Sequence, residues 1–391
     1  MTDVGEAAPR AVTVPTGRRP ASSSRDDGGA APVVPLRVGM VGGGFMGRVH
    51  TAAVRAAGGH VVAVASSSPA SASRAAAALG VATAHDTVQG LLDDPGVDVV
   101  HVCAPNAVHA DLVLAALAAG KHVVCEKPLA TSTAEADALV LAARAAGTVA
   151  AVPFVYRYHP MVREARARVA SGLTGRVLSV RGSYLQDWLL DSGDVDWRVE
   201  SASGGPSRAF ADIGSHLVDL LEFVLGDAIS SLSAVVDRVH DERGGRAVDT
   251  EDEAAVVFET SAGVIGTLFV SQVAPGRKNR LLVDVAGTAE SLEFAQEEPD
   301  QLWIGRRRGS EVVPRDAALL VPDAARLSTL PAGHPMGYLD AFTAFVRDVH
   351  DAVRGGRPEG LPRFDDGRRA VVVTDSVLLA AAERRWVDVP T

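Results

Sequence analysis

A glycine-rich segment, Gly42-Gly43-Gly44-Phe45-Met46-Gly47, constrains the fold of this chain more than any other feature. It directly follows an apolar run at 36–41, and a stretch of helical composition continues from it through Ala57. Glycines at these spacings permit a tight turn and a close approach to a pyrophosphate, whose charge is stabilised by N–H groups at the start of the helix. The segment therefore predicts a dinucleotide site lined by Gly42, Gly44, Phe45, Met46 and Gly47.

Short β-rich runs alternate with alanine-rich helical stretches over the first half of the chain. The expected strands are 36–41, 61–66, 81–84, 97–103, 121–125 and 149–154, and the stretches at 110–119 and 135–146 favour helix. Such alternation is typical of a doubly wound parallel sheet. We therefore predict an α/β Rossmann domain at 35–154. Residues 1–34, which are rich in Pro, Ala, Gly, Ser and Arg, are expected to form a disordered tail.

The second half has a different rhythm, with several strands in succession and few helices between them. Helices are expected at 159–171 and around 207–225, and strands at 175–187, 229–240, 252–260, 263–272, 280–286, 290–295 and 301–306. Strands joined by turns predict an open mixed or antiparallel sheet with helices on one face. We expect an α+β domain at 155–391 for substrate binding and oligomerisation, with terminal helices at 336–354 and 364–385 packing back on the body.

Composition limits the possible partners of the chain. A formal charge of −10 over 391 residues argues against nucleic acid and favours a small molecule. Cys103 and Cys125 lie in expected buried strands, so we predict no disulfide framework and a cytoplasmic location. No run reaches the roughly 18 apolar residues of a membrane span. The histidines lack metal-ligand spacing, which predicts no metal site. The exposed edges and face of an open sheet predict a homodimer or homotetramer.

Two further motifs end neighbouring strands of the first sheet. Ala104, Pro105, Asn106 and His109 follow the fourth strand, and Glu126-Lys127-Pro128 follows the fifth. Parallel strands bring these ends to one edge, where open α/β sheets bind ligands. We expect both motifs to line the dinucleotide site, with His109 as a brace. X-Pro bonds are usually trans, although a cis bond before Pro128 would aim the ammonium group of Lys127 into the cleft.

The end of the second strand carries serines in place of the acid that binds the adenosine ribose in strict NAD enzymes. Ser66 and Ser67, with Arg74 in the next helix, leave room for a 2′-phosphate, which favours NADP. Alternatively, Ser66 to Ser68 only cap the helix that begins near Pro69. Both interpretations stay open, so the cofactor is expected to be NAD or NADP.

Together, the glycine loop, the Pro-Asn-x-x-His turn and the Glu-Lys-Pro motif resemble the Gfo/Idh/MocA family of oxidoreductases over about residues 36–390. The segments 183–188 (Ser-Tyr-Leu-Gln-Asp-Trp) and 211–216 (Ala-Asp-Ile-Gly-Ser-His) resemble those of its pyranoside dehydrogenases, the group that includes levoglucosan dehydrogenase. The resemblance implies a dehydrogenase that oxidises a ring secondary alcohol of a sugar or cyclitol. It also implies that Tyr156, Arg157, Gln186 and Trp188 face the substrate.

Asp212 and His216 stand four positions apart on the expected helix, which places them on one face. An imidazole titrates in the range needed for alcohol oxidation, so His216 is the expected general base. Asp212 would orient the substrate or the imidazole, and Lys127 would donate to the reacting oxygen. Some members of the family are thought to use the lysine as acid/base instead.

Two other functions fit the same residues. One is an NADPH-preferring reductase of keto- or anhydro-sugars, which Ser66 and Arg74 favour. The other is a non-catalytic regulator that senses a dinucleotide, since fold alone does not determine function. Retention of Lys127, Asp212 and His216 together favours catalysis.

Overall fold

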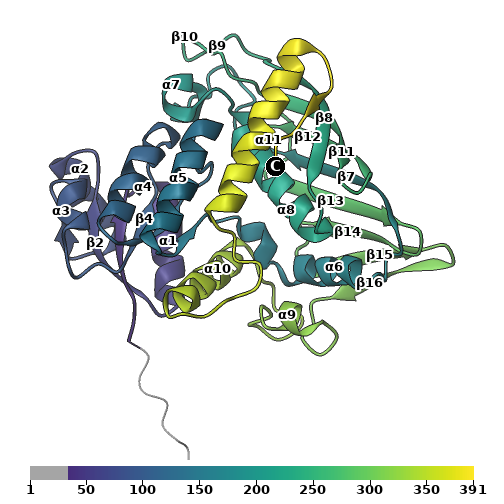
Figure 1. Ribbon diagram of the computed structural model, residues 1–391, viewed down its shortest axis with the longest axis horizontal. Coiled ribbons are helices and arrows are strands. Elements are labelled where there is room, and N and C mark those ends of the chain that lie inside the picture. The colour runs from purple at the N-terminus through teal and green to yellow at the C-terminus, as the bar shows by residue number, and fades with distance from the viewer. Residues whose placement is uncertain (1–33) are drawn as a thin grey trace, which may run out of the picture. The chain divides into compact units, whose positions relative to one another are not determined.

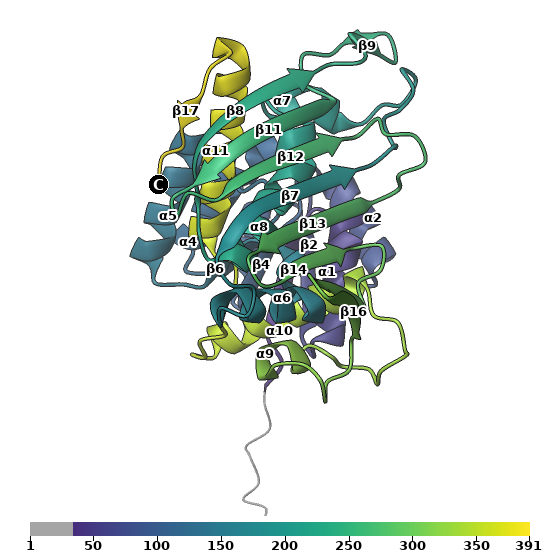
Figure 2. The same ribbon diagram turned by 90° about the vertical axis from the view of Figure 1, so that its right-hand side faces the viewer.

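The computed structural model describes residues 34–391, so the tail predicted at 1–34 lies outside the described residues except for its last position. Two sheets with their helices organise the described chain (Figures 1 and 2). A parallel sheet comes first and a larger mixed sheet follows, which confirms the predicted combination of folds.

Six parallel strands form the first sheet, in the order β3-β2-β1-β4-β5-β6. The strands are β1 (Arg37–Val41), β2 (His60–Ala65), β3 (Thr83–Ala84), β4 (Val99–Val102), β5 (His122–Cys125) and β6 (Ala150–Ala151). The helices are α1 (Phe45–Ala56), α2 (Pro69–Leu79), α3 (Val88–Leu92), α4 (His109–Ala118) and α5 (Thr133–Ala146), with the 3₁₀ turn η1 (Asn106–Val108). The strand order reverses between β1 and β4, and a ligand crevice opens at such a switch point.

Local sequence explains where several of these elements begin and end. The side chain of Ser68 caps α2 by accepting from the Ser71 N–H at 3.2 Å, Pro69 opens the helix, and Gly80 ends it in the left-handed conformation. The sixth strand is shorter than the predicted 149–154. Pro153 has no N–H to donate to a neighbouring strand, and the chain turns there into η2 (Val155–Tyr158).

Nine strands form the second sheet, in the order β16-β15-β14-β13-β7-β12-β11-β8-β17. They are β7 (Val177–Leu185), β8 (Ile229–Asp237), β11 (Glu253–Thr260), β12 (Ile265–Ser271), β13 (Arg280–Gly287), β14 (Ser291–Ala295), β15 (Gln301–Arg306), β16 (Gly309–Pro314) and β17 (Val387–Asp388). Neighbours are antiparallel except β7 and β12, which run parallel. A separate two-stranded hairpin joins β9 (Glu242–Arg243) to β10 (Arg246–Ala247).

One face of the second sheet is covered and the other is open. Helices α6 (Pro160–Ala170), α8 (Ser215–Leu225) and α11 (Phe364–Glu383) cover the inner face, and the outer face is turned to the viewer in Figure 2. Side chains alternate between the faces as in any half-buried strand. The outer side therefore exposes apolar residues: Val235, Val257, Ile265 and Phe269.

Sequence reasoning missed some elements of the second half. Strand β16 carries no apolar alternation, and its residues are largely exposed, so pairing with β15 alone defines it. The helix expected around 207–225 is divided into a π-helical turn η4 (Phe210–Gly214) and α8. Short helices complete the domain: α7 (Ser201–Gly204), α9 (Pro322–Ala325) and the 3₁₀ turn η3 (Trp197–Val199).

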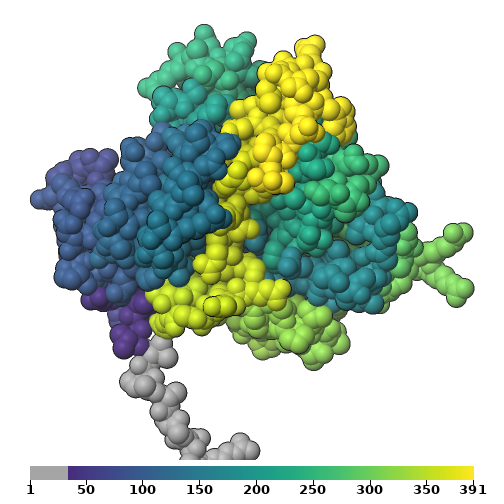
Figure 3. All heavy atoms as spheres, in the orientation of Figure 1, coloured from purple at the N-terminus to yellow at the C-terminus, as the bar shows by residue number. Residues whose placement is uncertain are grey.

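The C-terminal helices connect the two halves of the described chain. Helix α10 (Tyr338–Val353) packs against α1 of the first domain, and α11 contacts both α5 and β8. Figure 3 shows this last segment as a yellow band between the blue N-terminal part and the green sheet domain. The candidate site lies at this junction of the two domains.

Candidate active site

The glycine loop has the shape that a pyrophosphate requires. Gly42 follows β1 with φ +100°, and a Cβ there would lie 2.4 Å from the carbonyl oxygen of Cys103. A Cβ on Gly47 would lie 2.5 Å from the carbonyl oxygen of Gly42, so the turn and the first turn of α1 need this glycine. Apart from Gly44 itself and its two chain neighbours, no atom of residues 34–391 lies within 4 Å of a Cβ placed on Gly44. That open side leaves room for the phosphates at the positive end of α1.

A cavity of about 910 Å³ extends from this loop along the edge of the first sheet. It contains most of the positions predicted for the cofactor: Gly42, Gly44, Phe45, Met46, Ser66, Ser67, Arg74, Ala104, Pro105, Asn106, Glu126 and Lys127. Asp196, Trp197 and Arg198 from the second domain close it on the other side. Sequence reasoning missed these three residues, which no local motif marks.

His109 braces the loop rather than facing the cavity. The side chain is fully buried, and its ring nitrogens lie 2.9 Å from the carbonyl oxygen of Ala104 and 2.8 Å from that of Pro128. Burial lowers the pKa of the imidazole. His109 therefore ties the turn after β4 to the Glu-Lys-Pro segment after β5, as the expected brace would.

The serines at the end of β2 divide between the two predicted roles. Ser68 caps α2, whereas Ser66 and Ser67 line the cavity with Arg74. The Ser66 hydroxyl also lies 2.9 Å from that of Ser71. The two acidic residues that line the cavity, Glu126 and Asp196, come from neither β2 nor α2.

Lys127 and Asp212 form the central ion pair of the site. The peptide bond between Lys127 and Pro128 is cis, against the usual preference for trans. The Lys127 ammonium lies 2.6 Å from Asp212 Oδ1 and 2.9 Å from its carbonyl oxygen, and both side chains are mostly buried. Burial acts to raise the pKa of Asp212, but the positive charges of Lys127 and Arg198 outweigh it and lower the pKa to about 2. Asp212 is therefore a carboxylate at neutral pH.

Two residues of the second domain that sequence reasoning missed also contact Asp212. Gln272, which is fully buried after β12, donates to Asp212 Oδ2 at 2.8 Å. The Arg198 Nε lies 3.7 Å from Asp212 Oδ1, and its Nη1 donates to Asp196 Oδ1 at 3.1 Å. These contacts hold the carboxylate toward Lys127. The expectation that Asp212 orients the imidazole is not met, because its oxygens bind these other groups.

His216 lies one helical turn from Asp212 in an aromatic enclosure. Its ring meets those of Tyr156 and Phe154 edge to face, with centroids 5.1 and 5.8 Å away. Burial lowers the pKa of His216 well below the usual value, and the nearby charge of Lys127 lowers it further. Its Nδ1 is buried without a hydrogen-bond partner among residues 34–391, so Nε2 is the nitrogen suited to meet a substrate. The imidazole is neutral and able to accept a proton.

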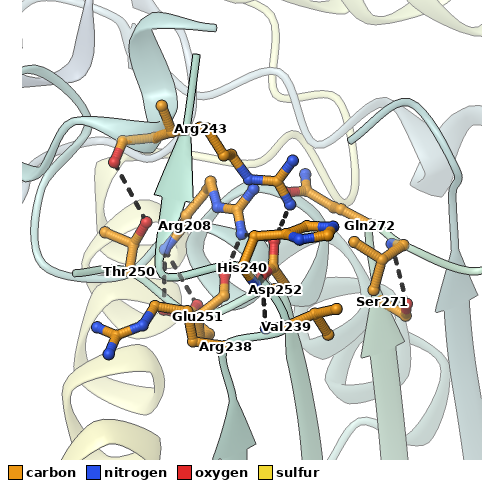
Figure 4. Close-up of polar contacts among 12 residues, drawn as sticks. Arg208, Arg238, Val239, His240, Arg243, Thr250, Glu251, Asp252, Ser271 and Gln272 are labelled. Atoms are coloured by element: carbon orange, nitrogen blue, oxygen red, sulfur yellow. Dashed lines mark hydrogen bonds and ion pairs between the residues drawn. The ribbon is translucent and has the colours of Figure 1, made fainter. Parts of the chain in front are cut away.

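A buried ionic network anchors the start of the helix that carries Asp212 and His216. The Glu251 carboxylate accepts from the Ser207 hydroxyl at 2.7 Å and from the N–H groups of Arg208 and Phe210 at 3.0 and 2.9 Å. Figure 4 shows the guanidinium groups of Arg208 and Arg243 converging on Asp252, all three fully buried. The network fixes where the π-helical turn begins, and with it the position of Asp212.

Three of the four residues predicted to face the substrate belong to one hydrogen-bonded chain, and one of them, Tyr156, contacts His216. The Trp188 indole donates to Gln186 Oε1 at 2.8 Å, and Gln186 donates to Asn279 Oδ1 at 2.8 Å. Tyr184 donates to the same oxygen at 2.7 Å and contacts the Tyr156 hydroxyl at 2.6 Å. This polar chain leads from the half-exposed Trp188 to the aromatic enclosure of His216.

Arg157 lies elsewhere, which corrects the expectation that it faces the substrate. Its Nε donates to Asp219 Oδ2 at 2.8 Å, and its Nη2 lies 2.7 Å from Asp366 Oδ1. The guanidinium also lies over the Phe223 ring, 4.8 Å from the centroid. The residue ties η2 to α8 and α11. The resemblance is a match between sequences, and it could not show that the side chain of Arg157 turns away from the neighbouring Tyr156.

Comparisons with known proteins identify the family. The family model of oxidoreductases with an NAD-binding Rossmann fold matches residues 36–154, and that of the GFO/IDH/MocA C-terminal domain matches residues 162–293. The chain is 32% identical to levoglucosan dehydrogenase of Pseudarthrobacter phenanthrenivorans, over 91% of this chain and 98% of the relative. The chain belongs to the Gfo/Idh/MocA family of oxidoreductases. Its first domain is therefore an NAD(P)-binding Rossmann domain.

Other members show how closely the fold of this family is kept. A structure of levoglucosan dehydrogenase in complex with NADH and levoglucosan has a TM-score of 0.85 at 31% identity, covering 91% of this chain and 100% of that one. Scyllo-inositol 2-dehydrogenase (NAD(+)) of Bacillus subtilis is 25% identical over 71% of this chain and 80% of the relative. The resemblance expected from the motifs is confirmed, and sugar and inositol dehydrogenases are among the relatives.

Residues 34–391 hold no group of three or more His, Cys, Asp or Glu side chains placed to bind a metal ion. None of their helices has the length and apolar character needed to cross a membrane. Cys103 and Cys125 are both free thiols.

Proposed function

We propose that this protein is an NAD(P)-dependent oxidoreductase that interconverts a ring secondary alcohol and a ketone of a sugar or cyclitol. The observation that carries the proposal is the Lys127–Asp212 ion pair, 2.6 Å long, whose lysine lines the dinucleotide cavity and lies near the neutral His216. Relatives named for levoglucosan and scyllo-inositol support the substrate class.

The residues divide the chemistry between them. A nicotinamide cofactor, when bound, supplies the hydride acceptor for oxidation and the hydride donor for reduction. His216 takes the hydroxyl proton during oxidation, because its buried ring is neutral at physiological pH. Lys127 donates a hydrogen bond to the reacting oxygen and stabilises its negative charge. Asp212 holds the ammonium group in place.

An alternative assigns the proton transfer to Lys127. Lys127 lines the cavity together with the glycine loop, whereas His216 is not among the lining residues and packs against Tyr156. Under this alternative, His216 would only orient the substrate hydroxyl. The two assignments differ in the pH dependence of turnover that they predict.

Substrate recognition is assigned to the polar chain beside His216. Trp188 offers an aromatic face to a sugar ring, and Gln186 and Tyr156 offer amide and hydroxyl groups. Arg157 is not assigned to substrate recognition, because its guanidinium group already pairs with Asp219 and Asp366.

NADP is the second candidate cofactor. Ser66, Ser67 and Arg74 line the end of the cavity where a 2′-phosphate would bind, and no acid opposes it there among the described residues. This arrangement supports the alternative of an NADPH-preferring keto- or anhydro-sugar reductase. A strong kinetic preference for NAD would refute it.

A screen of pyranosides and inositols with NAD and NADP, followed by nicotinamide absorbance, tests the proposal. We expect turnover in the wild type and its loss in both Lys127→Ala and His216→Ala, with dinucleotide affinity retained. Lys121→Ala is the matched control, since Lys121 lies at the opposite end of β5 and binds the carbonyl oxygens of Asp94 and Val97. Dinucleotide binding without turnover on any alcohol or ketone would favour a non-catalytic dinucleotide sensor.

A homodimer or homotetramer remains our proposal for the assembly. The open face of the second sheet exposes Val235, Val257, Ile265 and Phe269, an apolar area that a second copy would cover. The proposed compartment is the cytoplasm, where both free cysteines would stay reduced.

A further inference from the structure

A buried chain of three titratable side chains ends in the wall of the dinucleotide cavity. His101 on β4 and His50 on α1 face each other with their Nδ1 atoms 2.8 Å apart. The other nitrogen of His50, Nε2, lies 2.8 Å from Oε1 of Glu126. Both histidines are fully buried and Glu126 is 5% exposed, yet Glu126 lines the cavity. The mechanism proposed above uses none of these three groups.

The geometry of the chain determines where its protons lie. Burial acts to raise the pKa of Glu126, but the hydrogen bond from His50 and nearby positive charge lower it, so Glu126 is ionised and accepts from His50 Nε2–H. Burial holds the pKa of His101 well below its usual value, so that ring carries one proton. Only one of the facing Nδ1 atoms can carry a proton. Either His101 donates to a neutral His50, or a doubly protonated His50 donates to His101.

The surroundings favour the first arrangement. Nε2 of His101 is buried without a partner among residues 34–391. If His101 donates from Nδ1, its Nε2 carries only a lone pair, which stays without a partner. In the second arrangement His101 Nε2 would carry an unpaired N–H, and His50 would be a cation. The Phe342 ring lies 4.6 Å from that of His50, an apolar neighbour that disfavours a cation in the interior. In the favoured arrangement His50 serves Glu126 as a hydrogen-bond donor through Nε2 and not as a counter-charge.

The charge of the nearest lysine, Lys127, helps to lower the pKa of Glu126, but its ammonium group does not pair with that carboxylate. The ammonium group of Lys127 binds the side chain and the carbonyl oxygen of Asp212. Lys127 reaches Glu126 only through its backbone N–H, which donates to Oε2 at 3.2 Å. The wall of the cavity next to the proposed catalytic ammonium thus carries an ionised carboxylate that forms no ion pair with a lysine or arginine of residues 34–391.

We propose that the chain His101–His50–Glu126 makes the site selective for the oxidised form of the nicotinamide cofactor. The inference rests on the proposed function in one respect: hydride transfer beside Lys127 requires the nicotinamide ring to lie at this end of the cavity. The oxidised ring is a cation and the reduced ring is neutral, so a carboxylate favours the oxidised ring. Glu126 would contact the cofactor, and His50 and His101 are positioning residues that hold its carboxylate.

Dissociation constants of the full-length protein for both redox forms test the inference without any sugar. The dissociation constant of NAD⁺ is compared with that of NADH, and the dissociation constant of NADP⁺ is compared with that of NADPH. The pair that binds more tightly is then used for the variants. For Glu126→Gln and His50→Leu we expect the oxidised form to weaken about tenfold relative to the reduced form, as for unit charges several ångströms apart in a partly shielded site. His50→Gln, whose amide can still donate to the carboxylate, is expected to keep the wild-type ratio.

Thr51→Ala is the matched control. Thr51 is the buried neighbour of His50 on α1, and its hydroxyl has no partner among the described residues, so the ratio should stay within about twofold of the wild type. A ratio unchanged in Glu126→Gln, or an equal loss of affinity for both forms, would overturn the inference. If His50→Leu does not fold, Glu126→Gln still decides.

Nitrogen-15 NMR of the wild-type histidines gives an independent reading. Protons on His50 Nε2 and His101 Nδ1 would support the inference, whereas two protons on His50 would neutralise Glu126 and overturn it. A failed sugar screen with a shifted ratio in Glu126→Gln would remove the dehydrogenase proposal and leave the redox selectivity in place. Turnover with an unshifted ratio would do the reverse.

Discussion

Replacing Asp212 by Asn is the most direct test of the central ion pair. The substitution keeps the shape of the side chain but removes the charge that holds the Lys127 ammonium at 2.6 Å. Gln272 can still donate to the remaining amide oxygen, so the local packing should survive. What changes is that a mostly buried ammonium loses its counter-charge.

The magnitude follows from the pKa of Asp212. The pKa falls from 3.8 to about 2 on folding, because the charges of Lys127 and Arg198 outweigh the opposing effect of burial. At about 1.4 kcal/mol per pKa unit, the ionised carboxylate contributes about 2 kcal/mol to the free energy of unfolding. A depressed pKa stabilises the fold above the unfolded value of 3.8, and this stabilisation is lost as the pH falls toward 2. The contribution should therefore be complete at pH 7 and smaller at pH 3.

Urea unfolding of the wild type and of Asp212→Asn at pH 7 and pH 3 measures the contribution of the carboxylate to the free energy of unfolding. We expect the variant to be less stable by about 2 kcal/mol at pH 7, with a narrower gap at pH 3. Its kcat should fall about 100-fold, because Lys127 is no longer held at the reacting oxygen. Asp137→Asn is the control. The side chain of Asp137 is 47% exposed and pairs with Arg368, so this substitution should lower the free energy of unfolding by less than about 1 kcal/mol.

Two results would refute this reasoning. Equal stability of Asp212→Asn and the wild type at pH 7 would mean that the carboxylate gains nothing from Lys127 in the fold. A gap of the same size at pH 3 would show that the loss comes from altered packing and not from charge. Full turnover with either result would remove Asp212 from the site.

Three further predictions concern individual roles. The acid limb of kcat/KM for alcohol oxidation is expected below pH 6.5, because burial lowers the pKa of His216; a limb far above that value would assign the proton transfer to Lys127. Arg157→Met should cost about 3 kcal/mol in urea unfolding, since it leaves the buried Asp219 unpaired, with KM for the sugar unchanged. A raised KM at unchanged stability would restore its substrate role. Arg74→Ala should weaken NADP about tenfold and spare NAD in equilibrium titrations, whereas equal effects would contradict a 2′-phosphate site.

Motifs that act through the local backbone could be predicted from the sequence. Gly42 and Gly47 are needed because a Cβ would strike the neighbouring backbone, and such a need leaves a fixed spacing in the chain. The turn after β4 and the segment after β5 could be placed at one edge because parallel strands end together. His109 bonded to the carbonyl of Pro128 is the contact that this reasoning anticipates.

Residues brought in by tertiary packing left no such mark. Arg198 and Gln272 reach Asp212 from a 3₁₀ turn and from the end of β12, 14 and 60 positions away, and neither belongs to a motif. Arg157 and Tyr156 are adjacent in the chain, yet their side chains point to different partners, Asp219 and Tyr184. Adjacency in sequence cannot predict such divergence, because it depends on which helices pack on either side of η2.

The site is divided between the two domains, and this division explains why its parts must be held so firmly. Lys127 comes from the edge of the first sheet, while Asp212 and His216 come from a helix of the second domain. A shift of about 1 Å between the domains would therefore separate the ammonium from its carboxylate, a displacement large enough to impair catalysis. Packing of α10 on α1 and of α11 on α5 holds the first domain against such a shift. The hydrogen bond from the Phe210 N–H to the Glu251 carboxylate holds the start of the helix that carries Asp212. The ion pair thus reports whether the two domains are correctly docked, and its loss in Asp212→Asn would weaken the junction as well as the chemistry.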